Sequence, residues 1–233
     1  MYRLVLHQSL PSVVRLAMVT TTVLLMWYMA TQLLDIRLEA SFRRDQVTSQ
    51  STNGTAPRPV RFKCGLTEPC PDKHFAFRVV SGSASIVGPK ICFEDVVLMS
   101  SIKNNVGRGL NFAVVNGVTG ALLDVRTFDM WAGDVEELLK FLRTIQRGSI
   151  VLVATFDDGA TKLSVEARQL LSHLGSTAVN SLAFRDSWVF VGAQGIYAKS
   201  PFELHVRNNQ DTNKYEGWPE ALELEGCVPV KEN

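Results

Sequence analysis

The 233-residue chain carries 24 lysine and arginine residues against 23 aspartate and glutamate residues, a formal net charge of +1. Nucleic-acid binding needs a basic face that neutralises phosphates, so this balance gives no support for a nucleic-acid partner. The length suits one folded domain behind an N-terminal segment, with enough chain to bury a core.

The N-terminal segment has the pattern of a targeting sequence. Leu16–Leu34 carries no charge, and Arg3 and Arg15 precede it with no acidic residue before Asp35. A basic stretch followed by an apolar one is typical of a signal peptide or a signal anchor. The apolar stretch is just long enough to cross a bilayer, and small residues for cleavage are sparse. Cleavage and retention as a type II anchor both stay open, and we assign residues 1–42 to this segment.

A linker follows at residues 43–60. It is rich in Ser and Thr, contains Pro57 and Pro59, and holds the only N-x-[ST] sequon of the chain, at Asn53. Exposure behind a targeting sequence predicts a glycan on Asn53. The remaining residues, 61–233, form the predicted folded domain.

All the cysteines lie in the predicted domain, at Cys64, Cys70, Cys92 and Cys227. An even number of cysteines behind a targeting sequence indicates two disulfides, and the sequence permits three pairings. A zinc site is disfavoured because no C-x-x-C pair and no histidine pair at ligand spacing is present. We therefore expect neither a metal nor a cofactor.

Several stretches have the composition of β-strands. His74–Val80 is rich in aromatic and β-branched residues. Leu110–Val115 and Leu122–Phe128 flank a turn-forming stretch, which predicts a hairpin. Ile150–Phe156 and Trp188–Val191 are continuous apolar runs, typical of strands that are covered on both faces.

Two helices are predicted among these strands. Apolar residues recur at helical spacing in 135–145 and again in 167–174. Ser164 is placed to cap the second helix and Gly175 to end it. This mixture of hairpins and helical crossovers indicates an α+β domain, with a doubly wound α/β sheet as the alternative. The periodicity fades after Gly195, but Cys227 and the aromatic Trp218 predict that the tail packs on the domain.

The domain also contains long, recognisable strings: KCG…PCP, HFAFRVVSG, VGPKICFED, NNVGRG, FDMWAGD, DDGATKL, FRDSWVFVG, KSPFE, NKYEGWPE and EGCVP. These strings resemble the "family with sequence similarity 3" group, which comprises secreted cytokine-like proteins such as pancreatic-derived factor and interleukin-like EMT inducer. The resemblance implies a compact single domain of two twisted antiparallel β-sheets flanked by short helices. It also implies that Cys64 pairs with Cys92 and that Cys70 pairs with Cys227.

The same domain is similar to the stem of protein O-mannose N-acetylglucosaminyltransferase, a lectin-like module for β-linked N-acetylglucosamine. The sugar-facing residues of that stem match Asp157 and Arg185, which are therefore the candidate carbohydrate-binding residues. In the structural alternative, Asp157 and Asp158 start a turn and Arg185 forms an ion pair with a neighbouring acid. Trp131 and Trp188 are candidate stacking platforms, although tryptophans more often belong to a core.

The resemblance implies a secreted, non-enzymatic, cytokine-like signalling protein with a lectin-like fold. Its expected partners are an unknown cell-surface receptor and, as a candidate, a glycan. Only the N-terminal segment is expected to contact a membrane. The alternative is a Golgi-resident accessory or sugar-modifying protein, held as a single-pass type II membrane protein. No catalytic residues are assigned, because neither a G-x-S-x-G elbow nor a dinucleotide-type glycine motif is present.

Overall fold

The computed structural model describes residues 20–30, 61–196 and 198–231. Residues 20–30 are helical, and Pro59–Asn233 forms a compact unit of its own. The linker, its sequon at Asn53 and the rest of the predicted targeting segment lie outside the described residues. Among the residues that are described, no helix is both long enough and apolar enough to cross a membrane.

The strands of the domain form two sheets, with the orders β3-β2-β1-β9 and β5-β4-β6-β7-β8. The strands of the first sheet are β1 (His74–Val80), β2 (Lys90–Phe93), β3 (Val96–Met99) and β9 (Glu223–Pro229). Those of the second are β4 (Gly109–Asn116), β5 (Leu122–Phe128), β6 (Ser149–Phe156), β7 (Ser187–Ala193) and β8 (Phe202–Val206). The helical elements are η1 (Lys63–Gly65), α2 (Val135–Thr144), α3 (Val165–His173) and η2 (Ala178–Ser181).

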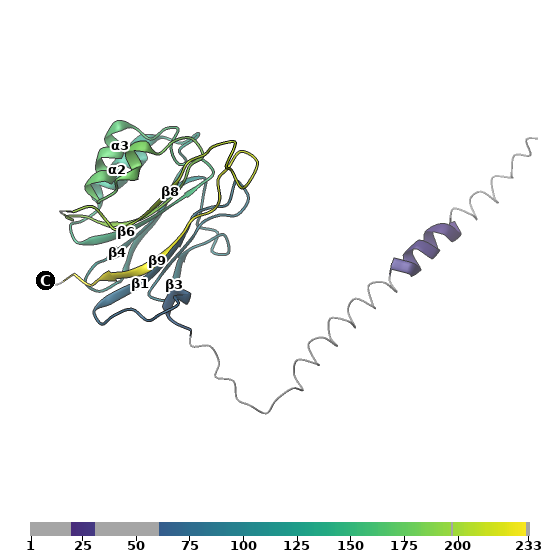
Figure 1. Cartoon of the computed structure of the whole chain (residues 1–233), viewed down its shortest axis with the longest axis horizontal. Helices are drawn as coiled ribbons and strands as arrows, with labels where there is room; N and C mark the ends of the chain where they lie inside the picture. Colours follow the sequence, from purple (N-terminus) through teal and green to yellow (C-terminus); the bar gives the residue numbers. More distant parts are fainter. Residues whose placement is uncertain (1–19, 31–60, 197, 232–233) are drawn as a thin grey trace, which may run out of the picture. The chain divides into compact units, whose positions relative to one another are not determined.

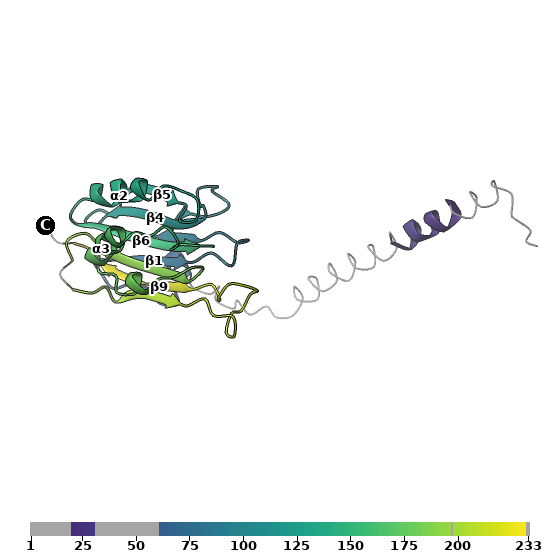
Figure 2. The same cartoon turned by 90° about the horizontal axis from the view of Figure 1, so that it is seen from above.

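The five-stranded sheet is the middle of three layers (Figure 1). Helices α2 and α3 lie side by side on one of its faces, and the four-stranded sheet covers the other (Figure 2). The residues of strand β6 explain why this sheet is covered on both faces. Val151 and Val153 pack in the core under the helices, whereas Ile150, Leu152 and Ala154 pack in the core between the sheets. Successive side chains of a strand point to opposite faces, so a continuous apolar run needs cover on both.

Both predicted helices form, and their first turns are capped by side chains. The Asp134 carboxylate accepts a hydrogen bond from the Glu136 N–H at 2.9 Å, and the Ser164 hydroxyl accepts one from the Ala167 N–H at 3.2 Å. Each cap satisfies a backbone donor that has no partner inside the helix. Gly175 follows α3 with φ +103°, a conformation that ends a helix at little cost when the residue is glycine.

The predicted α+β class is confirmed, and every described strand pair is antiparallel, which excludes the doubly wound alternative. The disulfide pairing implied by the family resemblance is also present. Cys64 is bonded to Cys92 with the Cα atoms 5.7 Å apart, and Cys70 is bonded to Cys227 with the Cα atoms 5.6 Å apart. The second bridge fastens β9, the last strand, to the start of the domain.

We predict that the two disulfides contribute unequally to stability. Their sequence separations are 28 and 157 residues, and the chain-entropy account makes the longer loop worth about 1.5 kcal/mol more. Denaturant unfolding of Cys70→Ala/Cys227→Ala should therefore show a greater loss of unfolding free energy than that of Cys64→Ala/Cys92→Ala. Equal losses would mean that local packing, not loop closure, sets the contribution of each bridge.

A single carboxylate fastens the edge strand β8 to the helical side of the domain. Glu203 accepts hydrogen bonds from the Ser176 hydroxyl, from the N–H and hydroxyl of Thr177, from the Ala178 N–H and from the Trp188 indole. Burial acts to raise the pKa of Glu203, but these donors, which favour the charged form, outweigh burial and lower the pKa.

The charge of Glu203 should make stability depend on pH. Because its pKa is lower in the folded than in the unfolded chain, its contribution is present above the unfolded value and is lost as the pH falls through the folded one. Stability should decline below roughly pH 4.5, the ordinary value for a glutamate. Glu203→Gln should cost about 1–3 kcal/mol at neutral pH and should flatten this acid limb in chemical denaturation. If Glu203→Gln leaves the acid limb unchanged, other carboxylates cause the loss of stability at low pH.

Candidate functional site

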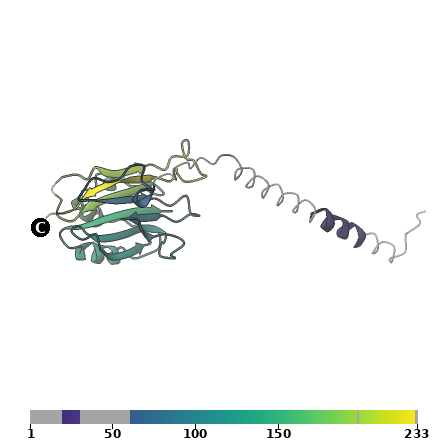
Figure 3. The same cartoon turned by 90° about the horizontal axis from the view of Figure 1, so that it is seen from below.

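The pairing of β6 with β7 brings the two candidate carbohydrate-binding residues to the same end of the domain. The strands run antiparallel, with Ile150 opposite Ala193 and Ala154 opposite Val189. Asp157 directly follows β6, and Arg185 stands just before β7. The loop that leads into β9 is at this end as well (Figures 2 and 3). Loops at the ends of rigid strands are a common place for binding residues.

Both residues are held in a left-handed backbone conformation, with φ 59° at Asp157 and φ 60° at Arg185. This region is tolerated by aspartate but is sparsely populated by arginine, and it costs of order 1–3 kcal/mol unless the surroundings compensate. Tight turns thus follow β6 and precede β7, and the two side chains that they carry form an ion pair.

Both side chains contact a third residue, Trp218. Asp157 Oδ1 lies 3.8 Å from Arg185 Nε, an ion pair beyond hydrogen-bonding distance. The Trp218 indole N–H donates to the same Asp157 oxygen at 3.0 Å. Arg185 Cζ lies 3.9 Å from the centroid of the Trp218 ring and 4.7 Å from that of Phe184. The guanidinium is therefore stacked on aromatic rings with a carboxylate beside it, an arrangement that fixes its plane.

The inner edge of the guanidinium is enclosed. Arg185 Nε is buried and makes no hydrogen bond with any residue that the structure describes, and the Asp157 carboxylate lies beside it. About a third of the Arg185 side chain remains exposed. Its terminal nitrogens are thus the atoms of the guanidinium that are available to a ligand.

Those nitrogens border an open groove of about 640 Å³. The groove is lined by Arg185 and by residues of the loop before β9, namely Gln210, Asn213, Lys214, Tyr215, Glu216, Gly217 and Trp218. Asp157 is not among the lining residues. Its carboxylate holds Arg185 and Trp218 from behind, so the arrangement makes Asp157 a positioning residue for the groove.

A tight turn shapes this loop. Tyr215 and Trp218 exchange two backbone hydrogen bonds of 3.1 Å, and Glu216 and Gly217 form the turn between them. Gly217 has φ +79°, and a Cβ atom there would lie 3.0 Å from a terminal nitrogen of Arg185. A glycine is therefore required both by the turn and by the close approach of the guanidinium.

The turn that carries Arg185 is fixed by its neighbour Asp186. The buried Asp186 carboxylate accepts from the Ala183 N–H at 2.8 Å, from the Asn208 N–H at 2.7 Å and from His205 Nε2 at 2.7 Å. Burial acts to raise the pKa of Asp186, but the bond from His205 and the two backbone N–H groups outweigh it and lower the pKa. Asp186 therefore joins the Arg185 turn to the start of the groove loop.

Other sequence candidates are structural. Asp158 is buried, and its Oδ1 accepts from the N–H groups of Ala160 and Thr161, so for this residue the turn interpretation holds. Trp188 is fully buried and belongs to the core under the helices, so it is not a stacking platform. Trp131 is half exposed, and its ring centroid lies 5.7 Å from that of Phe184.

A second ion pair lies close to the site. Arg108 donates from Nε and Nη2 to the Asp129 carboxylate at 2.6–3.2 Å. These bonds lower the pKa of Asp129 to about 2. The hydrogen bond to Asp129 in turn raises the pKa of Arg108, and the charges of Asp157 and Asp158 act weakly in the same direction. Arg108 thus fastens the start of β4 to the end of β5 and places a positive charge behind the acids of the site.

The sequence pointed to Asp157 and Arg185 but did not place Trp218 or Phe184 with them. Trp218 was expected to pack on the domain, and its contact with Asp157 accounts for that packing. Phe184 precedes Arg185, and only the left-handed turn at Arg185 brings the guanidinium over the Phe184 ring. No spacing rule relates residue 157 to residue 218, because the contact depends on sheet order. Across the described parts of the chain, no cluster of His, Cys, Asp and Glu residues is arranged to hold a metal.

Comparisons with known proteins agree with this architecture. A family model described as "Interleukin-like EMT inducer" matches residues 108–196. Protein FAM3C of Rattus norvegicus is 54% identical over 223 residues, which cover 94% of this chain and 97% of the relative. Protein FAM3A of Homo sapiens is 62% identical over 180 residues, 77% of this chain and 78% of the relative. The chain belongs to the FAM3 family. The membership confirms the resemblance seen in its sequence strings, and FAM3 proteins provide the frame for a functional proposal.

We predict that Trp218 stabilises the domain through two separable contacts. Trp218→Phe keeps a ring against Arg185 but removes the hydrogen bond to Asp157, and it should cost about 0.5–1.5 kcal/mol. Trp218→Ala also removes the buried apolar area, and it should cost about 2–4 kcal/mol. Thermal melts under non-reducing conditions measure both losses. If neither variant melts lower than the wild type, the loop is merely tethered by the Cys70–Cys227 bridge.

Proposed function

We propose that this FAM3 protein is a secreted, non-enzymatic, cytokine-like signalling protein whose groove at Arg185 binds carbohydrate. A cell-surface receptor is the expected partner at the level of the family. The observation that carries the carbohydrate proposal is the Arg185 guanidinium, which is stacked on Trp218 and Phe184 and opens on a groove with both donors and acceptors.

Secretion is supported by the disulfides and by the family. Two disulfides suit an oxidising compartment, and one of them closes nearly the whole domain into a loop. The uncharged stretch Leu16–Leu34, behind Arg3 and Arg15, supplies a route into the secretory pathway. Membership of a family named for interleukin-like proteins favours signalling through a receptor.

The chemistry of the groove suits a polyhydroxy ligand. Sugar hydroxyls both donate and accept, so their recognition needs donors and acceptors in one place, with an aromatic ring under the apolar face of the sugar. Arg185 and Lys214 supply donors, Glu216 supplies a carboxylate, and Tyr215 supplies an exposed ring. The carboxylate of Asp157 keeps the guanidinium in place for this role.

The same contacts favour binding over catalysis. One Asp157 oxygen already accepts the Trp218 N–H and lies beside Arg185, so the geometry suits a positioning group and is not that of a general acid. The Arg185 guanidinium offers hydrogen-bond donors and no acceptor, which suits recognition of a ligand's oxygens. Both residues therefore fit recognition of a ligand that leaves unchanged.

Glycan-array binding tests the proposal. Arg185→Ala should weaken binding to β-linked N-acetylglucosamine probes by about tenfold or more, because it removes charge-assisted hydrogen bonds. Arg185→Lys, which keeps the charge but not the planar guanidinium, should weaken binding nearly as much. The melting temperature should change little, since an ion pair at the solvent edge contributes about 0–1 kcal/mol.

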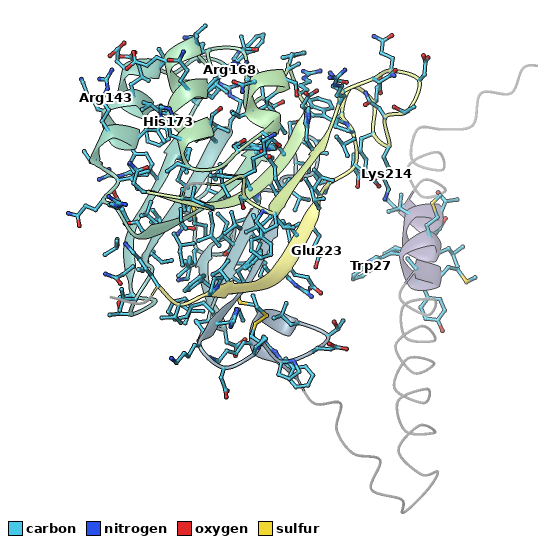
Figure 4. The ribbon with its side chains drawn as sticks, turned by 60° about the vertical axis from the view of Figure 1, so that its left-hand side comes forward. Trp27, Arg143, Arg168, His173, Lys214 and Glu223 are labelled. Atoms are coloured by element: carbon cyan, nitrogen blue, oxygen red, sulfur yellow. A yellow bond between two sulfur atoms is a disulfide. The ribbon has the colours of Figure 1, made fainter. Side chains whose placement is uncertain are left out.

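Arg143→Ala is the matched control. Arg143 is an exposed arginine that is also paired with an acid, Glu166. It lies on α2, on the helical side of the domain and apart from the loop that carries Lys214 (Figure 4). Its removal should leave glycan binding unchanged. Absence of glycan binding by the wild type, or a large melting loss in Arg185→Ala, would make the cluster a structural one.

A further inference from the structure

The two most exposed large apolar side chains among the described residues of the domain, Ile102 and Ile86, stand on two neighbouring loops. Ile86 is 85% exposed and Val87 is 58% exposed in the loop between β1 and β2, and Ile102 is 98% exposed in the loop between β3 and β4. Single exposed apolar residues are ordinary on protein surfaces. Here three of them stand on two neighbouring loops, so their shared exposure needs an explanation.

The two loops pack against each other. A Cβ atom on Gly88 would lie 2.6 Å from the Ser101 hydroxyl and 2.8 Å from a Val106 methyl carbon, so the absence of a side chain at Gly88 permits the contact. The Gly82 N–H donates to the Thr155 carbonyl at 2.7 Å, which ties the first loop to the end of β6. Loops of this part of the chain project from the same end as the loop before β9 (Figure 3).

Hydrogen bonds hold both tips in a defined shape. The N–H groups of Ile86 and Val87 donate to the Ser83 carbonyl at 3.2 Å, and the Ser83 N–H donates back to Val87 at 2.8 Å. In the second loop, the Lys103 N–H donates to the Ser100 carbonyl at 3.1 Å. The turns that carry Ile86 and Ile102 are therefore ordered, and they hold both side chains in solvent.

The charge of the two loops has one sign. Residues 81–90 and 100–107 contain no acidic residue, and the ionisable side chains within them are the exposed Lys90 and Lys103. Arg108, which follows the second loop, is engaged by Asp129. Apolar tips flanked by lysines complement a phospholipid surface, where the tips enter the interfacial region and the ammonium groups meet lipid phosphates.

We infer that this end of the domain docks on a phospholipid membrane, with Ile86, Val87 and Ile102 inserted and with Lys90 and Lys103 at the headgroups. A protein partner fits less well. A stable protein interface needs about 1,000 Å² or more of complementary surface, whereas these loops offer three exposed apolar side chains among Ser, Gly and Asn residues. A bilayer adapts to separate tips because lipids rearrange around each one.

The test is cosedimentation with vesicles of phosphatidylcholine, with and without phosphatidylserine. Ile86→Asp/Ile102→Asp should weaken binding to both kinds of vesicle by about tenfold or more, because charged tips stay in water. Ile86→Ser/Ile102→Ser, which adds no charge, should weaken binding in the same direction. Lys90→Gln/Lys103→Gln should remove most of the gain from phosphatidylserine and its salt dependence.

The matched control uses exposed apolar residues elsewhere on the domain. Leu123 on β5 is 51% exposed and Val165 on α3 is 73% exposed. Leu123→Asp/Val165→Asp should leave vesicle binding unchanged. The full chain and residues 59–233 are compared in parallel, since the apolar N-terminal stretch is itself expected to bind lipid. The fragment contains both disulfides and every residue of the two cores, and cooperative melting verifies its fold.

Each remaining result overturns the inference. These are failure of the wild-type fragment to bind vesicles, equal binding by the isoleucine double variants, and an equal loss in the Leu123→Asp/Val165→Asp control. If gel filtration shows that Ile86→Asp/Ile102→Asp changes the oligomeric state, the tips belong to a protein interface instead. The vesicles carry no sugar, so the outcome is independent of the carbohydrate proposal.

Discussion

The rest of the structure depends on the burial of β4, β6 and β7 on both faces. Nearly every residue of β6 is buried, and alternate side chains enter two separate cores. A strand of this kind is stable only when both of its faces are covered. The central sheet therefore needs both the helices and the four-stranded sheet. The long disulfide loop fits this requirement, because it holds β9, the last strand of the covering sheet, next to β1.

The rigidity of these strands determines where chemistry is possible. Because β6 and β7 are antiparallel neighbours, their Asp157 and Arg185 ends are fixed relative to each other before any side-chain contact forms. The left-handed turns at both residues then bring the carboxylate and the guanidinium together at the cost of backbone strain. Trp218 compensates for part of that cost, since it donates to one residue and stacks on the other.

The sequence predicts elements that have a local signal. The helices follow from apolar spacing and, for α3, from the cap at Ser164, and the central strands follow from apolar runs such as 150–156. The two-sheet architecture and the disulfide pairing came from resemblance to a family, because composition does not distinguish the possible pairings. Of the site, Asp157 and Arg185 were accessible in this way, whereas the place of Trp218 behind the groove requires the fold of the long loop before β9.

The end of the domain with the candidate site differs from the rest in what its loops present. Elsewhere, partly buried carboxylates such as Glu203 have their oxygens occupied by hydrogen-bond donors. Here the terminal nitrogens of Arg185 face a groove, and Ile86 and Ile102 face solvent on hydrogen-bonded turns. None of these exposures adds to the stability of the fold, since buried apolar and paired polar groups supply it. The stability of the fold therefore does not account for these exposures, and this is why both proposals made above are placed at this end of the domain.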